Sequence, residues 1–192
     1  MIMETWFSSD HHFGHKNIIT YCDRPFDSVA VMNEELVAAW NSCVEPGDLV
    51  YYLGDFSLSP TVMEQYAGRL NGKKILICGN HDACHPSNHE GKMVGTTRYK
   101  QHFAEIFTEH EWGELLLHHM PYHDEHDHRY PEYRPFDQGK VLLHGHVHQR
   151  WTTNGRQINV GVDVWDYLPV HEDQIMELVR KVEEESFQSA ND

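Results

Sequence analysis

Five short apolar segments of this chain are each followed by residues that commonly bind metal ions. The segments begin near Thr5, Asp48, Lys73, Glu114 and Lys140. The polar residues that follow them are, in chain order, Asp10, His11 and His12; Asp55; Asn80, His81 and Asp82; His118 and His119; and His144, His146 and His148. Ligands of open α/β sheets bind in the crevice outside the carboxyl ends of the strands. The pattern therefore predicts that these residues, although far apart in the sequence, meet in one site.

The order of the predicted elements favours an α/β fold with mixed sheet structure. Apolar runs predict strands within 5–9, 48–54, 73–79, 114–119, 140–145 and 156–161. Amphipathic patterns predict helices within 27–44, 59–70 and 173–187. Strands that alternate with helices are typical of α/β proteins, and the second half is richer in strands. We expect a single domain over 1–192, with a polar loop at the site over 121–138 and a frayed tail over 187–192.

Charge and cysteine usage argue against several classes of protein. The net charge is −15, and binding to nucleic acid or to a membrane surface depends on Lys and Arg. Nucleic acid is therefore disfavoured as a partner without being excluded. None of the four cysteines forms a C-x-x-C pair, so a thiolate zinc site is not expected. No run approaches the roughly 18 apolar residues of a membrane span, and no signal peptide is visible. We expect a cytoplasmic protein with no membrane contact, and the oligomeric state stays open.

The types of the predicted ligands indicate which metals could bind. Taken singly, an Asp after a strand is usually a turn residue, and a buried His is more often hydrogen-bonded than a ligand. Taken together, the selection of Asp, His and Asn, with Gly before Asp55, Asn80 and His146, favours metal binding. Imidazole, carboxylate and amide groups without thiolate suit Mn²⁺ first, and also Fe, Zn, Ni or Co. The ligands outnumber those that one ion takes, so we expect two divalent ions bridged by Asp55.

The motifs D-x-H, G-D, G-N-H-D, H-x-P and G-H-x-H, in this order, resemble those of the calcineurin-like metallophosphoesterase superfamily. They correspond here to Asp10–His12, Gly54–Asp55, Gly79–Asp82, His119–Pro121 and Gly145–His148. The opening segment further resembles small single-domain bacterial and phage members. The resemblance implies a β-sheet sandwich flanked by helices, in four layers ordered α/β/β/α. It also implies two ligand sets, namely Asp10, His12, Asp55 and His148 for one ion, and Asp55, Asn80, His119 and His146 for the other.

The same resemblance implies hydrolysis of a phosphomonoester or phosphodiester, a small nucleotide being one possibility. A hydroxide held between the two ions would attack phosphorus, and His81 would act as general acid rather than as a ligand. His11 and His118 fall outside the ligand positions and would have supporting roles. A nuclease and a non-catalytic metal-binding scaffold on the same fold remain the alternatives.

One departure from the family pattern bears on the substrate. Protein phosphatases of this superfamily continue the second motif with Asp-Arg, where this chain has Leu58 and Ser59. A protein substrate is therefore not expected, and Asp82 is the remaining candidate to orient His81, although adjacent side chains often point apart. Phosphate contacts must come from elsewhere, and the candidates are Arg24, Arg129, Arg134 and Lys16, although residues of this kind are more often ordinary surface cations. The loop over 121–138 could stack a base on its aromatic residues or simply be solvated.

The stretch from His144 to His148 contains three alternating histidines. In a regular strand all three side chains would lie on one face and could share one ion. Gly145 marks the end of regular strand, so simple alternation need not continue. We expect His146 and His148 to bind different ions of the pair, and His144 to support the site without binding metal.

Overall fold

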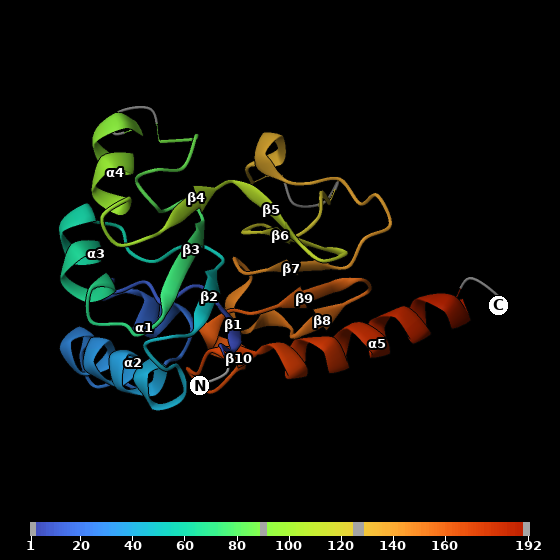
Figure 1. Cartoon of the computed structure of the whole chain (residues 1–192), viewed down its shortest axis with the longest axis horizontal. Coiled ribbons are helices and arrows are strands. Elements are labelled where there is room, and N and C mark those ends of the chain that lie inside the picture. The colour runs from blue at the N-terminus through green and yellow to red at the C-terminus, as the bar shows by residue number, and fades with distance from the viewer. Residues whose placement is uncertain (1–2, 89–91, 125–128, 190–192) are drawn as a thin grey trace.

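Two β-sheets are stacked face to face, and helices flank the sandwich (Figure 1). The computed structural model describes residues 3–88, 92–124 and 129–189. Both sheets contain parallel and antiparallel strands, so the predicted α/β fold with mixed sheets flanked by helices is confirmed. No helix in the described part of the chain is long and apolar enough to cross a membrane.

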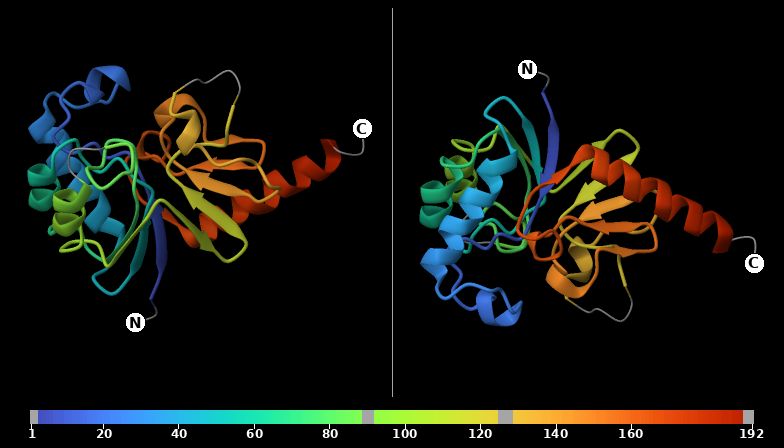
Figure 2. Two further views of the ribbon diagram at one scale, coloured as in Figure 1. Left: turned by 90° about the horizontal axis from the view of Figure 1, so that it is seen from above. Right: turned by 90° about the horizontal axis from the view of Figure 1, so that it is seen from below.

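The first sheet has the strand order β10-β1-β2-β3-β4, and only β10 runs antiparallel to its neighbour. Its strands are β1 (Thr5–Ser8), β2 (Leu49–Tyr52), β3 (Lys73–Ile77), β4 (Glu105–Phe107) and β10 (Val170–His171). The helices between them are α1 (Ile18–Tyr21), α2 (Val29–Cys43), α3 (Pro60–Ala67) and α4 (Lys92–Tyr99). They lie together on the side of this sheet that faces away from the second sheet (Figures 1 and 2).

The second sheet has the order β5-β6-β7-β9-β8, with β6, β7 and β9 parallel. Its strands are β5 (Glu109–Trp112), β6 (Leu115–His118), β7 (Leu142–His144), β8 (Thr153–Asn154) and β9 (Gln157–Asn159). Three short 3-10 helices are η1 (Pro131–Tyr133), η2 (His148–Arg150) and η3 (Val162–Val164). The chain then returns to the first sheet through β10 and continues into α5 (Glu172–Ser189).

Two apolar cores hold these layers together. Phe7, Leu53 and Ile77 of the first sheet face Leu117 and Leu143 of the second, and one side of α5 completes this inner core. The other face of the first sheet packs against the helices in a second core. Burial of such side chains contributes roughly 1.5–3 kcal/mol each before conformational entropy is counted. The strands are therefore held rigidly on both sides, which fixes where their carboxyl ends lie.

Several predicted boundaries differ from the structure. The helix near the C-terminus runs from Glu172 to Ser189, so part of the expected frayed tail is helical, and 190–192 lie outside the described residues. The loop over 121–138 contains η1, and its residues 125–128 also lie outside the described part. α4, β4 and β5 were not predicted from the sequence.

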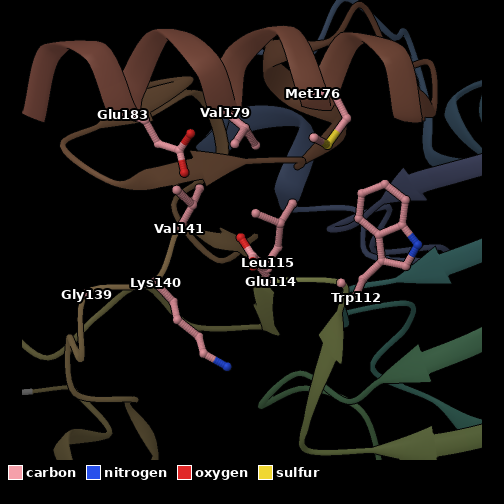
Figure 3. Close-up of a pocket in the computed structure, with 10 residues that line it drawn as sticks. Trp112, Glu114, Leu115, Gly139, Lys140, Val141, Met176, Val179 and Glu183 are labelled. Atoms are coloured by element: carbon pink, nitrogen blue, oxygen red, sulfur yellow. The ribbon is translucent and has the colours of Figure 1, made fainter.

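A large apolar cavity lies between α5 and the second sheet, apart from the predicted site. Its volume is about 840 Å³, and Met176 and Val179 of α5 point toward Leu115 and Val141 across it (Figure 3). None of the described residues that line it belongs to the predicted metal or catalytic set.

Candidate metal centre

The strands of both sheets bring the predicted ligands to one edge of the sandwich. Asp10 and Asp55 follow the parallel strands β1 and β2, and the backbone N–H of Asp10 donates to the carbonyl of Gly54 at 3.0 Å. The second sheet joins the first here because the N–H of His146 donates to Asp10 Oδ2 at 3.0 Å. The predicted convergence of residues distant in sequence is thereby observed.

Six of the seven predicted ligands form two clusters that meet at one carboxylate. The first cluster is Asp10, His12 and His148, and the second is Asp55, His119 and His146, each with ligand atoms within 4.8 Å of one another. Asp55 Oδ2 lies 3.4 Å from His119 Nε2 and 3.6 Å from His12 Nε2. The Asp55 carboxylate is therefore placed between the two clusters, where a bridging ligand has to be.

The donor atoms of this centre are buried and lack partners. Those without a hydrogen-bond partner among the described residues include Asp10 Oδ1, His12 Nε2, Asn80 Oδ1, His119 Nε2 and His146 Nε2. A buried polar atom left unsatisfied costs about 1–3 kcal/mol, so five together are hard to explain as ordinary core structure. Divalent transition-metal ions take such nitrogen and oxygen donors. The residues present therefore fit a metal centre.

Hydrogen bonds on the far side of the ligands orient them toward this centre. His119 Nδ1 lies 2.7 Å from the carbonyl of Leu53, and His148 Nδ1 lies 3.0 Å from Asp163 Oδ2. Asp10 Oδ2 accepts from the Ser9 hydroxyl and from backbone, which leaves Oδ1 for an ion. Such supporting bonds fix the orientation of each ring and the nitrogen that faces the metal.

The backbone at the ligands is unusual. Five of the seven predicted ligands have φ between +52° and +70°, and they are Asp10, His12, Asp55, His146 and His148. Residues other than glycine rarely adopt this left-handed conformation, which costs about 1–3 kcal/mol and occurs preferentially at functional sites. Because His146 and His148 both have it, the alternation of a strand ends with β7 at His144, as predicted.

Two glycines allow the strand ends to approach one another. A Cβ atom on Gly79 would lie 2.2 Å from Asp55 Oδ1, and one on Gly145 would lie 1.8 Å from Ser9 Oγ. Neither position has room for a side chain, since real Cβ atoms do not come so close to other atoms. The glycines of the G-N-H-D and G-H-x-H motifs are thus required by the contact between the loops.

The site combines neutral rings with a strong negative potential. Burial lowers the pKa of His12 and His146 well below the ordinary value, so both rings are neutral, the form that binds metal. Burial acts on His119 as well, but the neighbouring Asp55 outweighs it and raises the pKa to about 9. Burial lowers the pKa of His148 as well, but the neighbouring Asp163, Cys22 and Asp10 outweigh it and raise the pKa to about 10. The centre therefore favours positive charge.

His81 lies at the rim of this centre. Its side chain is 42% exposed, and its Nε2 is 3.9 Å from Asp55 Oδ2. The backbone N–H of His81 donates to Asp55 Oδ1 at 2.9 Å, which holds its segment against the bridging residue. His81 belongs to neither ligand cluster.

Asp82 is directed away from His81 and into the core. Its carboxylate accepts from the backbone N–H groups of Asp55 at 2.9 Å, Phe56 at 3.0 Å and Gly79 at 2.9 Å. It therefore ties the loop after β2 to the loop after β3 and does not orient His81.

The three arginines predicted to contact phosphate have different surroundings. The side chain of Arg24 is fully buried, with bonds to Asp163 at 2.7 and 2.9 Å and to the carbonyls of Asp10 and His11. The prediction that Arg24 contacts substrate is therefore wrong, because its guanidinium is enclosed beneath the metal ligands. Arg129 lines a cavity that is also bordered by Asp55, His81 and His146, which we call the metal-site cavity. Arg134, although buried, lines a neighbouring cavity.

Three other histidines lie outside both clusters. His11 Nδ1 is 3.0 Å from the hydroxyl of Tyr52, and His118 Nδ1 is near the backbone of Met120. His144 is fully buried, with Nδ1 2.6 Å from the carbonyl of Gly145. Burial lowers the pKa of His144 to about 3, so its ring is neutral.

Two residues with a bearing on the site were missed at the level of sequence. Asp163 supports His148 and pairs with Arg24, yet it follows β9 in a segment without any of the recognised motifs. Arg150 borders the metal-site cavity two residues after the G-H-x-H motif. The apolar run over 156–161, which ends just before Asp163, was the one signal that could have pointed to it.

Comparisons with known proteins agree with this geometry. Residues 3–164 match the family model of the calcineurin-like phosphoesterase superfamily domain. The Gene 66 protein of Mycobacterium phage L5 is 36% identical, over 94% of this chain and 96% of that protein. An uncharacterized protein of Methanocaldococcus jannaschii is 34% identical, over 90% of this chain and 89% of that protein.

Among solved structures, the crystal structure of a protein of unknown function from Aquifex aeolicus superposes with a TM-score of 0.69 at 29% identity. The match covers 92% of this chain and all of that one. The family match spans most of the chain and includes every predicted ligand. This chain therefore belongs to the calcineurin-like phosphoesterase superfamily.

Proposed function

We propose that this protein is a phosphoesterase that holds two divalent metal ions and hydrolyses a phosphomonoester or a phosphodiester. The observation that carries the proposal is the meeting of two clusters of buried ligand atoms at Asp55. Unpartnered donors in left-handed loops at the ends of rigid strands are costly in a protein that binds nothing there. Membership of the superfamily suggests the reaction class, and the residues of the site are the metal-binding and acid groups that this reaction needs.

The ligands divide between two ions. Asp10, His12 and His148 would hold the first ion, with Asp55 as the shared ligand. Asn80, His119 and His146 would complete the second set around the same carboxylate. When bound, such a pair of ions lowers the pKa of a shared water toward neutrality and offsets charge on the phosphoryl oxygens. The mixed imidazole, carboxylate and amide donors suit divalent transition metals; Mn²⁺ is the ion that we propose first, with Fe, Zn, Ni and Co as the other candidates.

His81 is the proposed general acid. Its ring is exposed at the rim, where its Nε2 can donate a proton to the leaving oxygen of a bound ester. Its backbone is held by Asp55, so the ring is positioned relative to the metal ligands. A group that donates a proton in this way typically accelerates hydrolysis by about 10²–10⁴-fold.

Two alternative functions, a nuclease and a non-catalytic scaffold, can be distinguished from this proposal. A nuclease would need a basic surface for a polymer, and the chain carries a net charge of −15. A non-catalytic scaffold would have no need for the complete ligand set or for His81 at the rim. We favour a small phosphate ester as the substrate for these reasons.

The test is to measure metal content and hydrolysis together. Protein loaded with Mn²⁺ should hold two ions per chain and hydrolyse p-nitrophenyl phosphate or bis-p-nitrophenyl phosphate faster than it cuts short DNA. Asp55→Asn should lose both ions and nearly all activity, because the bridging charge is removed. Asp173→Asn, at a side chain that is 91% exposed, is the matched control. Full metal occupancy without hydrolysis of any of these substrates would favour the scaffold.

A further inference from the structure

A second cavity adjoins the metal-site cavity. The metal-site cavity has a volume of about 230 Å³ and is lined by Asp55, His81 and His146, among others. The adjoining cavity has a volume of about 420 Å³, and the two share Val147 and Arg150 as lining residues. Small-molecule sites usually measure about 300–1,000 Å³, so the metal-site cavity alone is small for a whole substrate. The adjoining cavity lies where it could hold the rest of the substrate.

The walls of the adjoining cavity are polar and carry positive charge. Arg134 and Arg150 contribute two guanidinium groups, against one carboxylate, Asp124, among the described residues that line it. The chain as a whole has twice as many acidic residues as Lys and Arg. Among the described lining residues the two arginines outnumber the one carboxylate, which on so acidic a chain favours an anionic ligand at this place.

Arg150 is the residue that connects the two cavities. Its side chain is exposed and has no hydrogen-bond or ion-pair partner within 3–88, 92–124 and 129–189. By contrast Arg69, Arg98 and Arg156 are each paired with a carboxylate. An exposed arginine without a partner is common by itself. Here, however, it borders both cavities and so can reach a ligand that occupies both.

The wall that carries Arg150 is held firmly to the metal ligands. Its N–H donates to the carbonyl of Val147 at 3.1 Å within η2, which begins at His148. The side-chain amide of Asn159 donates to the carbonyl of His148 at 2.8 Å and to that of Trp151 at 2.9 Å. The backbone of Arg150 therefore has a fixed position relative to the metal ligands, and the side chain reaches a ligand from there.

We infer that the adjoining cavity is a subsite for a second anionic group on the substrate. The substrate class is a small molecule with two phosphate groups. One phosphate ester is hydrolysed at the metal centre, and the other phosphate is bound by Arg150 with Arg134 beside it. Guanidinium groups suit this role because they bind phosphate through paired, charge-assisted hydrogen bonds. The inference rests on the proposed function for the first phosphate, whereas binding of the second can be measured without any turnover.

The experiment compares ligands that differ by one phosphate. The pairs are glucose 6-phosphate with glucose 1,6-bisphosphate, and adenosine 5′-monophosphate with adenosine 3′,5′-bisphosphate. Affinities are measured by calorimetry on the Mn²⁺-loaded His81→Ala variant, in which turnover should be slow, at equal free Mn²⁺, and by competition with p-nitrophenyl phosphate in initial rates of the wild-type protein. We expect the bisphosphate of at least one pair to bind about tenfold more tightly, equivalent to about 1.4 kcal/mol.

Variants then assign that preference to the subsite. Arg150→Ala should reduce the preference to twofold or less, and Arg150→Lys should retain part of it. Arg180→Ala, at an exposed arginine of α5, is the matched control and should leave the preference unchanged. Equal affinities within both pairs, or a preference that survives Arg150→Ala, would overturn the subsite even if p-nitrophenyl phosphate is hydrolysed. An Arg150-dependent preference in a protein that hydrolyses nothing would overturn the proposed function and leave the subsite standing.

Discussion

His81 combines an anchored backbone with a ring that is partly open to solvent. Its N–H is fixed to Asp55 Oδ1, whereas the rings of His12, His119 and His144 are buried. Exposure is what a proton donor needs, because the proton has to be replaced from solvent after each turnover. Burial, in contrast, favours the neutral, metal-binding form of His12 and His146 by lowering their pKa.

From this difference we predict that His81→Ala keeps two ions per chain and loses about 10²–10⁴-fold in kcat. Metal analysis and initial rates on p-nitrophenyl phosphate, measured on the same sample, check both parts. His102→Ala, beside Gly68 and outside the metal clusters, serves as the control. Loss of metal in the His81 variant would make it a ligand, and unchanged turnover would remove it from the mechanism.

At the scale of elements, the strand ends were predictable and the edges of the sheets were not. Apolar runs revealed β1, β2, β3, β6 and β7, because these strands are buried on both faces, and the motifs follow directly after them. β5 alternates exposed and half-buried residues at a sheet edge, so it has no apolar run to detect. α4 contains Gly95 and two threonines, which are poor helix formers, so its sequence does not predict a helix.

The contacts that support the metal ligands could not be predicted from the sequence either, because they join segments that share no sequence pattern. The Asp163 carboxylate in η3 holds both Arg24 and His148, and Arg24 in turn holds the carbonyls that follow β1. No spacing rule links a residue near position 24 with one near 163. The motifs identified ligands by type and order, but the bonds that orient the ligands became visible only in three dimensions.

This arrangement predicts a selective effect of Asp163→Asn. Removing the charge weakens the support of His148, and loss of such a supporting group typically costs 10–100-fold in metal affinity. We expect that loss for one of the two ions only, because within the described part of the chain Asp163 contacts His148 of the first cluster and no residue of the cluster around His119. Titration against a chelating dye measures both affinities.

Asp166→Asn, at an exposed position in the same segment, is the control for this prediction. Asp163→Asn also leaves Arg24 buried without its counter-charge. We therefore expect the free energy of unfolding of this variant to fall by on the order of 3 kcal/mol. Thermal unfolding therefore has to be recorded beside the titration. Equal weakening of both ions would mean that the change acts through general loss of structure.

For the whole molecule, the metal centre is the place where the two sheets are joined at their carboxyl ends. Asp10 and Asp55 extend from the first sheet, and His119 and His146 from the second. Bound ions would therefore link the sheets and offset the cost of the unpartnered donors and left-handed loops. In their absence the same residues destabilise the fold through crowded carboxylates and unsatisfied nitrogens.

Removal of metal should accordingly lower the melting temperature. An ion present at 100 times its Kd stabilises the folded state by about 2.7 kcal/mol, so two ions give about twice that. In a chain of this size 1 kcal/mol corresponds to about 2–4 °C, and a chelator should lower Tm by about 10 °C or more. Calorimetric scans with Mn²⁺ and with chelator measure the shift, and Asp55→Asn should show little of it. If the wild-type protein gave the same Tm with Mn²⁺ and with chelator, the ions would not join the sheets. A ligand that binds only the folded state must raise Tm.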